Sequence, residues 1–127
     1  MLQELYKEII LDHFRRPRHR QEVEGAEIEE HLNNPLCGDE VTVYANLGDG
    51  GLEVAHTGRG CAISQASASM LLEKMQGKSV EDAKQFSAED MLKLYGARLT
   101  PNRQKCCLLS WKVLQSAVHS PIGRDGE

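Results

Sequence analysis

The sequence has few aromatic residues and no long hydrophobic run. Only 5% of its 127 residues are Phe, Trp or Tyr, so we expect a core built mainly from aliphatic side chains. No apolar stretch reaches the roughly 18 residues that indicate a transmembrane helix. The amino-terminal stretch MLQELYKEIILDHF carries acidic residues where a signal peptide would have none. We therefore expect a cytoplasmic protein with no membrane partner.

The chain also lacks an excess of positive charge. Its formal net charge is −4, and its pI is about 5.7. This balance disfavours nucleic acid as the main partner. The one cluster of cationic residues comprises Arg15, Arg16, Arg18 and Arg20. We interpret this cluster as a solvated turn, and the alternative is a docking patch for an acidic partner.

The length and the composition fit one globular domain. A chain of 14.2 kDa with 40% hydrophobic and 27% charged residues is typical of a folded protein and not of a disordered chain or a coiled coil. A domain of this size buries roughly two-thirds of the surface of its unfolded chain. We expect a single domain over residues 1–127, with a flexible tail at residues 120–127.

Alternating apolar and polar residues predict a small antiparallel sheet of three strands. The turn Gly48-Asp49-Gly50-Gly51 is typical of a β-hairpin and joins the second and third strands. Ala26, Ile28 and Leu32 share one parity in the first strand. In the second strand, Val41, Val43, Ala45 and Leu47 alternate with polar residues, so one face of the sheet is available for packing. The predicted strands cover residues 26–32, 41–47 and 52–57.

Helical spacing and capping residues predict helices on both sides of these strands in the sequence. Strands that are followed by a run of helices imply an α+β fold, in which the sheet packs against a layer of helices. The predicted helices are residues 1–14, a helix from Cys61 that stops at Gly77, two short helices capped by Ser79 and Ser87, and a last helix from Pro101 that ends before Pro121.

The four cysteines form no CxxC pair, and a cytosolic chain is not expected to use them in disulfides. Cys37 and Asp39 lie on a predicted turn immediately before a strand. Cys61 follows a glycine turn at the start of a helix, where free N–H groups and the helix dipole favour a thiolate. Cys106 follows two cationic residues that also favour the thiolate.

Three thiolates and one carboxylate would provide the four ligands of a tetrahedral site. Sulfur-rich ligands favour Zn²⁺ or an iron–sulfur cluster over Mg²⁺ or Ca²⁺. Asp39 would bind less firmly than a fourth cysteine, so we hypothesise that its position is exchangeable. The residues alone leave a second interpretation open, in which the cysteines are small buried hydrophobic side chains. The glycines that flank Cys37 and Cys61 favour the metal site.

Four motifs, in order along the chain, resemble the U-type iron–sulfur cluster assembly family, which comprises SufU, IscU and the amino-terminal domain of NifU. The resemblance covers nearly the whole chain. It implies a compact α+β fold in which Cys37, Asp39, Cys61 and Cys106 converge at one exposed end as metal ligands. The motifs are LYKEIILDHF at 5–14 followed by Pro17-Arg18, NPLCGD at 34–39, GCAISQASAS at 60–69, and RQKC at 103–106 with Leu109 and Trp111 downstream.

Within this family the chain is most similar to SufU. The segment Gly-Cys-Ala-Ile-Ser and the Arg-x-Lys-Cys motif are typical of that branch, whereas IscU carries His where this chain has Lys105. The chain departs from the family pattern in three ways. The interval from Cys61 to Cys106 lacks the insertion usual in SufU, and Leu99-Thr-Pro-Asn does not match the segment by which IscU engages its chaperone. Cys107 stands where SufU usually has Ala.

The resemblance implies one of two functions. In the SufU manner, Zn²⁺ is held by the four ligands and Cys37 accepts persulfide sulfur from a PLP-dependent cysteine desulfurase of the SufS or IscS type. This would make the protein a zinc-dependent sulfurtransferase. In the IscU manner, the same residues bind iron and build a [2Fe–2S] cluster, and a non-enzymatic scaffold passes it to downstream assembly proteins or apo-proteins. Lys105 favours the first. A third alternative is an interaction module with a structural zinc site.

Other residues near these motifs have two interpretations each. Arg103 and Lys105 would steer the anionic persulfide or compensate the negative charge of the site, and the alternative is a pair of solvated cations at a helix end. Cys107 points away from Cys106 on a helix, so we predict a core residue. The alternative is a resolving thiol or a second sulfur carrier. For His13 and His31 we expect surface or packing roles.

Overall fold

The computed structural model describes residues 2–35 and 38–119 of the chain. The predictions for Cys37 and for the tail at residues 120–127 therefore lie outside the described residues. The described elements follow one another as a helix, three strands and four helices. They are α1 (Leu2–Arg15), β1 (Ile28–Asn34), β2 (Asp39–Gly48), β3 (Gly51–Arg59), α2 (Ala62–Met75), α3 (Val80–Gln85), α4 (Ala88–Tyr95) and α5 (Pro101–Val118).

The three strands form an antiparallel sheet in the order β1-β2-β3. Asn34 pairs with Asp39, and Glu40 pairs with Arg59. The end of β1, the start of β2 and the end of β3 therefore meet at one end of the sheet. The predicted three-stranded antiparallel sheet and α+β fold are confirmed.

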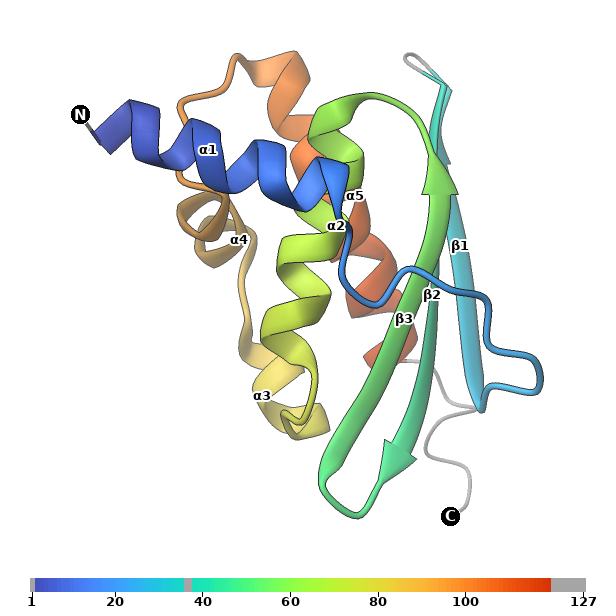
Figure 1. Ribbon diagram of the computed structural model, residues 1–127. Coiled ribbons are helices and arrows are strands. Elements are labelled where there is room, and N and C mark those ends of the chain that lie inside the picture. The colour runs from blue at the N-terminus through green and yellow to red at the C-terminus, as the bar shows by residue number, and fades with distance from the viewer. Residues whose placement is uncertain (1, 36–37, 120–127) are drawn as a thin grey trace.

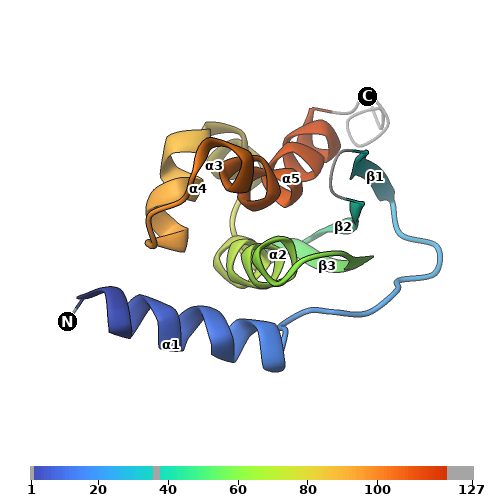
Figure 2. The same cartoon turned by 90° about the horizontal axis from the view of Figure 1, so that it is seen from above.

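The helices pack on one face of this sheet. Helices α2 and α5 contact the strands directly, and α1 lies on the side of α2 that faces away from α5 (Figures 1 and 2). The core between the helices and the sheet contains Val43, Leu71 and Leu114, and each of these side chains is 0% exposed. None of the helices within residues 2–35 and 38–119 is long and apolar enough to cross a membrane.

Two leucines that alternation places on the inner face of the sheet are less buried than expected. Leu32 is 39% exposed and Leu47 is 43% exposed. Leu32 lies on the edge strand β1, in a groove beside α5. Leu47 lies next to the hairpin turn, where it borders a surface hollow shared with Gly77 and Val80. Alternation identifies the face of a strand, but the helices do not cover the whole of that face.

Helix α1 is fastened to α2 by polar contacts. The Nδ1 atom of His13 lies 2.8 Å from the Oγ atom of Ser69, and the backbone N–H of Arg18 donates to the same Oγ atom at 2.7 Å. His13 is 6% exposed, so its packing role is confirmed. His31 is an exposed residue of β1, and its Nδ1 atom lies 2.8 Å from Thr42 Oγ1. Its surface role is also confirmed.

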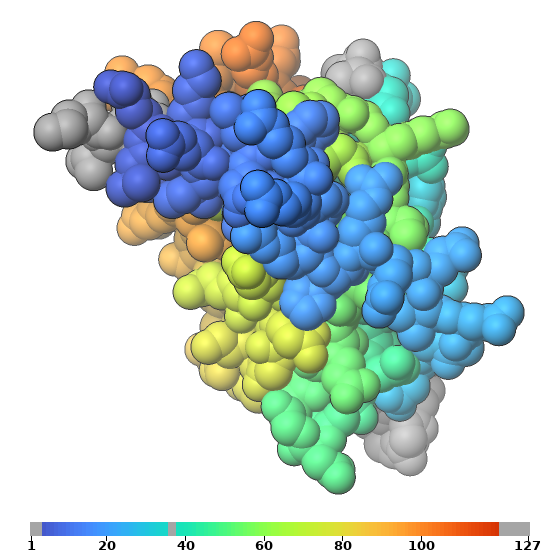
Figure 3. Space-filling view, in the orientation of Figure 1, coloured from blue at the N-terminus to red at the C-terminus, as the bar shows by residue number. Residues whose placement is uncertain are grey.

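The segment that follows α1 lies along the free edge of β3. The backbone N–H of His56 donates to His19 O at 2.8 Å, and the N–H of Gln21 donates to His56 O at 3.0 Å. In the space-filling view, α1 and this segment form a continuous blue band across the upper and middle part of the face toward the viewer (Figure 3). Arg15, Arg16 and Arg20 are exposed, as expected for a solvated turn, whereas Arg18 is half-buried. Arg18 and Arg20 also make side-chain contacts with distant elements, which a plain solvated turn does not predict.

Candidate functional site

Three potential metal ligands meet at the end of the sheet where β2 begins and β3 ends. Asp39 is the first residue of β2, Cys61 is the N-cap of α2 immediately after β3, and Cys106 lies near the start of α5. The hairpin brings the first two together, because it returns β3 to the start of β2. Packing of α2 against α5 adds the third.

The ligand atoms of Asp39, Cys61 and Cys106 lie within 4.8 Å of one another. Asp39 is 0% exposed and Cys106 is 7% exposed, whereas Cys61 is exposed. The backbone N–H of Cys61 donates to Asp39 Oδ1 at 2.7 Å, and the Cys61 Sγ atom lies 3.6 Å from Asp39 Oδ2. The cluster is therefore buried on the side of Asp39 and open to solvent on the side of Cys61.

Gly60 allows the chain to approach Asp39 this closely. Its φ of +144° is a conformation that L side chains rarely adopt. A Cβ atom at Gly60 would also overlap with Asp39 Oδ1 and lie 2.8 Å from Asp39 Cα. Two features of the structure therefore require glycine at position 60: its backbone conformation and its close approach to Asp39.

Arg20 contacts both sides of the turn that contains Gly60 and Cys61. Its Nη1 atom donates to Gln65 Oε1 at 2.7 Å, and its Nη2 atom donates to Gly58 O at 2.9 Å. Gly58 precedes Cys61 on β3, and Gln65 follows it on α2, so one guanidinium group connects the two flanks of the turn. This role is not visible in the sequence, because Arg20 lies in a charged, non-periodic segment.

The donor set fits a thiophilic metal. Ligand atoms around a tetrahedral zinc ion lie roughly 3.3 to 3.8 Å apart, given zinc–ligand bonds of about 2.0 to 2.3 Å. The separations in the cluster of Asp39, Cys61 and Cys106 are compatible with that geometry after small shifts. Two sulfur donors favour zinc or iron over Mg²⁺ or Ca²⁺. Of the four predicted ligands the structure brings three together, and Cys37 lies outside the described residues.

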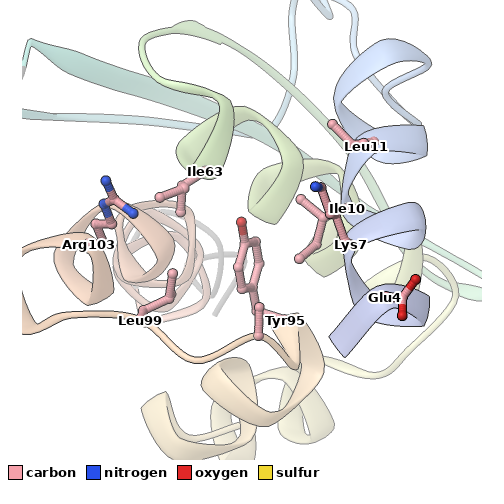
Figure 4. A pocket seen from close by; sticks show the side chains of 9 residues that line it. Glu4, Lys7, Ile10, Leu11, Ile63, Tyr95, Leu99 and Arg103 are labelled. Carbon is pink, nitrogen blue, oxygen red and sulfur yellow. The ribbon is translucent and has the colours of Figure 1, made fainter. Parts of the chain in front are cut away.

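Arg103 and Lys105 lie in two different hollows beside this cluster. Arg103 borders a cleft of about 410 Å³ between α1, the first turn of α2 and the loop before α5, together with Ile63 and Tyr95 (Figure 4). Lys105 borders a groove on the other side of α5, next to β1. Both cations are exposed. The two cations therefore border different hollows, one beside α1 and one beside β1.

Two buried side chains near the site, Tyr95 and Cys107, stay protonated at neutral pH. Burial raises the pKa of Tyr95 to about 12 and also raises the pKa of the Cys107 thiol to about 12. Cys107 is 0% exposed and belongs to the hydrophobic core. The prediction that Cys107 is a core residue is confirmed, and within the described part of the chain it stands outside the ligand cluster.

The sequence matches a family model described as the NifU-like N-terminal domain, over residues 5–126. One relative, the zinc-dependent sulfurtransferase SufU of Bacillus subtilis, is 34% identical over 96% of this chain and 95% of its own length. Another relative, the iron–sulfur cluster assembly scaffold protein IscU of Thermotoga maritima, is 36% identical over 90% of this chain and 92% of its own length. Relatives of both kinds are thus similarly close.

A solved structure shares the fold. It is the crystal structure of an iron–sulfur cluster assembly scaffold protein for the SUF system from Fervidobacterium islandicum. The TM-score is 0.78 with 31% sequence identity, and the match covers 91% of this chain and 97% of the other. The resemblance seen in the four motifs therefore extends to the whole fold.

Proposed function

The chain belongs to the NifU-like N-terminal domain family, and from this premise we propose that it is a zinc-dependent sulfur acceptor that works in iron–sulfur cluster assembly in the cytosol. The observation that carries the proposal is the convergence of Asp39, Cys61 and Cys106 at one end of the sheet, with Cys61 exposed. A relative described as a zinc-dependent sulfurtransferase supports the choice of metal. Cys37 is the fourth ligand in this proposal.

The proposed reaction is a thiol exchange on a persulfide. A PLP-dependent cysteine desulfurase presents a persulfide on its own cysteine. The Cys37 thiolate attacks the outer sulfur atom, a new S–S bond forms at Cys37, and the S–S bond of the donor breaks as the donor cysteine leaves as a thiolate. Zinc, when bound, keeps the cysteine ligands deprotonated and protected from oxidation, because it undergoes no redox chemistry.

The residues around the cluster have distinct roles in this proposal. Asp39, the one oxygen ligand, gives a weaker bond to a thiophilic metal than a fourth thiolate would, so the ligand set can rearrange when Cys37 takes up sulfur. Lys105 and Arg103 border two different hollows, and in this proposal they attract the anionic persulfide. The Lys105→Ala variant should accept sulfur more slowly without loss of the fold, and unchanged kinetics would remove Lys105 from the mechanism.

The second candidate is a scaffold that assembles a [2Fe–2S] cluster on the same residues. It is favoured by the relatives described as scaffold proteins, one of them 36% identical to this chain. In this candidate function iron and sulfur are the cargo, and the assembled cluster passes to apo-proteins or downstream assembly proteins. The two sulfur donors in the described cluster are compatible with either cargo.

One experiment separates the two candidates. Alanine production by a cysteine desulfurase is measured with the zinc-loaded, iron-free protein added, while mass spectrometry follows the mass of its cysteine peptides. We expect stimulation and an added sulfur atom on Cys37. The Cys37→Ser variant should abolish both effects, and the Cys107→Ala variant should retain them because Cys107 lies in the core. Absence of stimulation, with a cluster that forms only when iron is supplied, would instead establish the scaffold.

A further inference from the structure

A groove between the edge strand β1 and helix α5 leads to the ligand cluster. We name it the β1–α5 groove. Its volume is about 380 Å³, and its described lining residues are Leu32, Asn33, Asn34, Lys105, Leu109 and Lys112. Two of its residues are neighbours of ligand residues, because Lys105 precedes Cys106 in the sequence and Asn34 pairs with Asp39 in the sheet. A molecule that lies in this groove therefore reaches the cluster at one end.

The groove is basic in an acidic protein. The chain has a formal net charge of −4, yet the charged residues that line the groove are two exposed lysines, Lys105 and Lys112. Within residues 2–35 and 38–119, neither lysine takes part in an ion pair. Leu32 of β1, which is 39% exposed, adds an apolar surface on the side of the groove opposite the two lysines of α5. These features favour a ligand that combines negative charge with an apolar side chain.

The backbone of β1 favours an extended ligand. The strand is at the edge of the sheet, and β2 is its partner on one side. In the part of the chain that the structure describes, no strand pairs with its other side. An edge strand of this kind presents N–H and C=O groups that an extended peptide can pair with, and pockets for alternate side chains then give specificity.

The side chains of α5 set the spacing of such a ligand. Lys105, Leu109 and Lys112 follow the i, i+4, i+7 pattern of one helix face, and the two lysine Cα atoms are about 10.5 Å apart along the axis at 1.5 Å per residue. Alternate side chains of an extended chain are about 6.8 Å apart. An acidic residue two positions before and two positions after an apolar one spans about 14 Å, which the long lysine side chains can match.

We propose that the β1–α5 groove docks an extended acidic segment of an acceptor protein, with the pattern acidic–x–apolar–x–acidic. The segment adds a strand to the edge of β1, its carboxylates pair with Lys105 and Lys112, and its apolar residue packs on Leu32 and Leu109. The choice of an acceptor as partner rests on the proposed function, because the groove ends at the cluster from which cargo would leave. The binding itself needs neither zinc nor sulfur.

The test uses a synthetic peptide with this pattern, acetyl-Gly-Glu-Thr-Leu-Thr-Glu-Gly-amide, added to the isotopically labelled full chain. We expect NMR shift changes concentrated on β1 and on the exposed face of α5, with binding that weakens as salt is raised. The Lys112→Glu variant should bind the peptide about tenfold more weakly, because it replaces an attraction by a repulsion. The Lys78→Glu variant makes the same charge change in an exposed loop and should bind it normally.

Several outcomes would overturn the proposal. They are equal binding by the Lys112→Glu variant, equal binding of a peptide with Lys in place of Glu, and shift changes away from the groove. A concentration-dependent dimer that Lys112→Glu dissociates would show that a second copy of the chain occupies the groove instead. The measurement includes no desulfurase and no persulfide, so its failure leaves sulfur acceptance intact. Equally, a failure of sulfur acceptance would leave the peptide result standing.

Discussion

Arg20 illustrates how one side chain outside the ligand cluster can control the cluster. Because it bonds Gln65 and Gly58, it fixes the turn that presents Cys61. Contacts that orient metal ligands typically affect affinity by about 10- to 100-fold. We predict that the Arg20→Gln variant binds zinc about tenfold more weakly, measured by competition with a chromophoric chelator.

A matched arginine provides the control for this prediction. Arg16 lies four residues earlier, is exposed, and makes a solvent-exposed ion pair with Asp12 at 3.7 Å. The Arg16→Gln variant makes the same change in charge and should keep the zinc affinity of the wild type. In the metal-free protein, Cys61 of the Arg20→Gln variant should also react faster with iodoacetamide. Equal zinc affinity in the two variants would show that the turn holds its shape without Arg20.

His56 makes the stability of the folded state depend on pH. Its side chain is 1% exposed, and Nε2 lies 2.9 Å from Arg18 O. Burial is the main cause that lowers the pKa of His56 from 6.5 to about 4, and the cationic Arg20 nearby contributes to this shift. The folded state therefore binds fewer protons than the unfolded state between these pH values. This contribution to stability is fully present above pH 6.5 and is lost as pH falls toward 4, by up to about 3 kcal/mol.

We predict a smaller pH dependence for the His56→Gln variant. The free energy of unfolding, measured by urea denaturation from pH 7 to pH 4, should fall less steeply in this variant than in the wild type. The His31→Gln variant removes an exposed histidine and should keep the slope of the wild type. All three proteins are compared at the same zinc concentration, so the release of metal at low pH affects each of them equally and does not change the difference between their slopes. The same slope in all three proteins would mean that His56 binds protons equally in the folded and unfolded states.

At the residue scale, the sequence indicates the ligands and not the residues that support them. Asp39, Cys61 and Cys106 stand in short motifs whose residue types carry the chemistry, and the structure brings them together. Arg20 and Gln65 are 45 positions apart. Their contact depends on the path of the segment after α1 along β3, and no local pattern in the sequence encodes that path.

At the scale of elements, α1 depends on its contacts with α2. His13 and Arg18 both contact Ser69, and Glu73 on the same helix lies 3.5 Å from His13 Nε2 and from Arg18 Nε. We predict that the His13→Ala variant loosens α1, because loss of a buried hydrogen bond and of packing costs about 1 to 3 kcal/mol. Amide hydrogen exchange in α1 should accelerate by about tenfold or more, while exchange in β2 changes less.

An exposed histidine again offers the control. The His31→Ala variant should leave exchange in α1 unchanged, because His31 contacts Thr42 on the neighbouring strand. Burial is the main cause that lowers the pKa of His13, and the Arg18 guanidinium lowers it as well. Acceleration of exchange throughout the chain, rather than in α1, would show that α1 does not open separately and that the variant acts on global stability.

The order and type of the elements could be predicted from the sequence, and the ends of the strands could not, most clearly those of β1. Alternation places the first strand at residues 26–32, whereas β1 is Ile28–Asn34. Glu27 explains the late start, because its backbone N–H donates to the Asn46 side chain and its own carboxylate accepts from the N–H of Leu47. Hydrogen bonds through side chains therefore replace the backbone hydrogen bonds between β1 and β2 at Glu27. At the other end, pairing continues through Asn33 and Asn34, where no apolar residue marks it.

At the scale of the whole molecule, the apolar core extends well beyond the ligand cluster. The buried apolar residues between the helices and the sheet form one cluster that includes Val43, Leu71 and Leu114, and it continues to Leu52 at the hairpin end of the sheet, opposite the end that holds Asp39. A structural zinc site supplies the folding energy of its domain, and such domains unfold when the metal is removed. Here the apolar core provides an independent source of stability.

We therefore predict that removal of the metal leaves the protein folded. With free zinc at about 100 times its dissociation constant, binding stabilises the folded state by about 2.7 kcal/mol, so chelation should lower Tm by roughly 10 °C. Far-ultraviolet circular dichroism at 25 °C should be unchanged, while sulfur acceptance is lost. The Cys107→Ala variant, which changes the core, should lower Tm by similar amounts with and without zinc. Unfolding of the wild type on chelation would instead make the zinc structural.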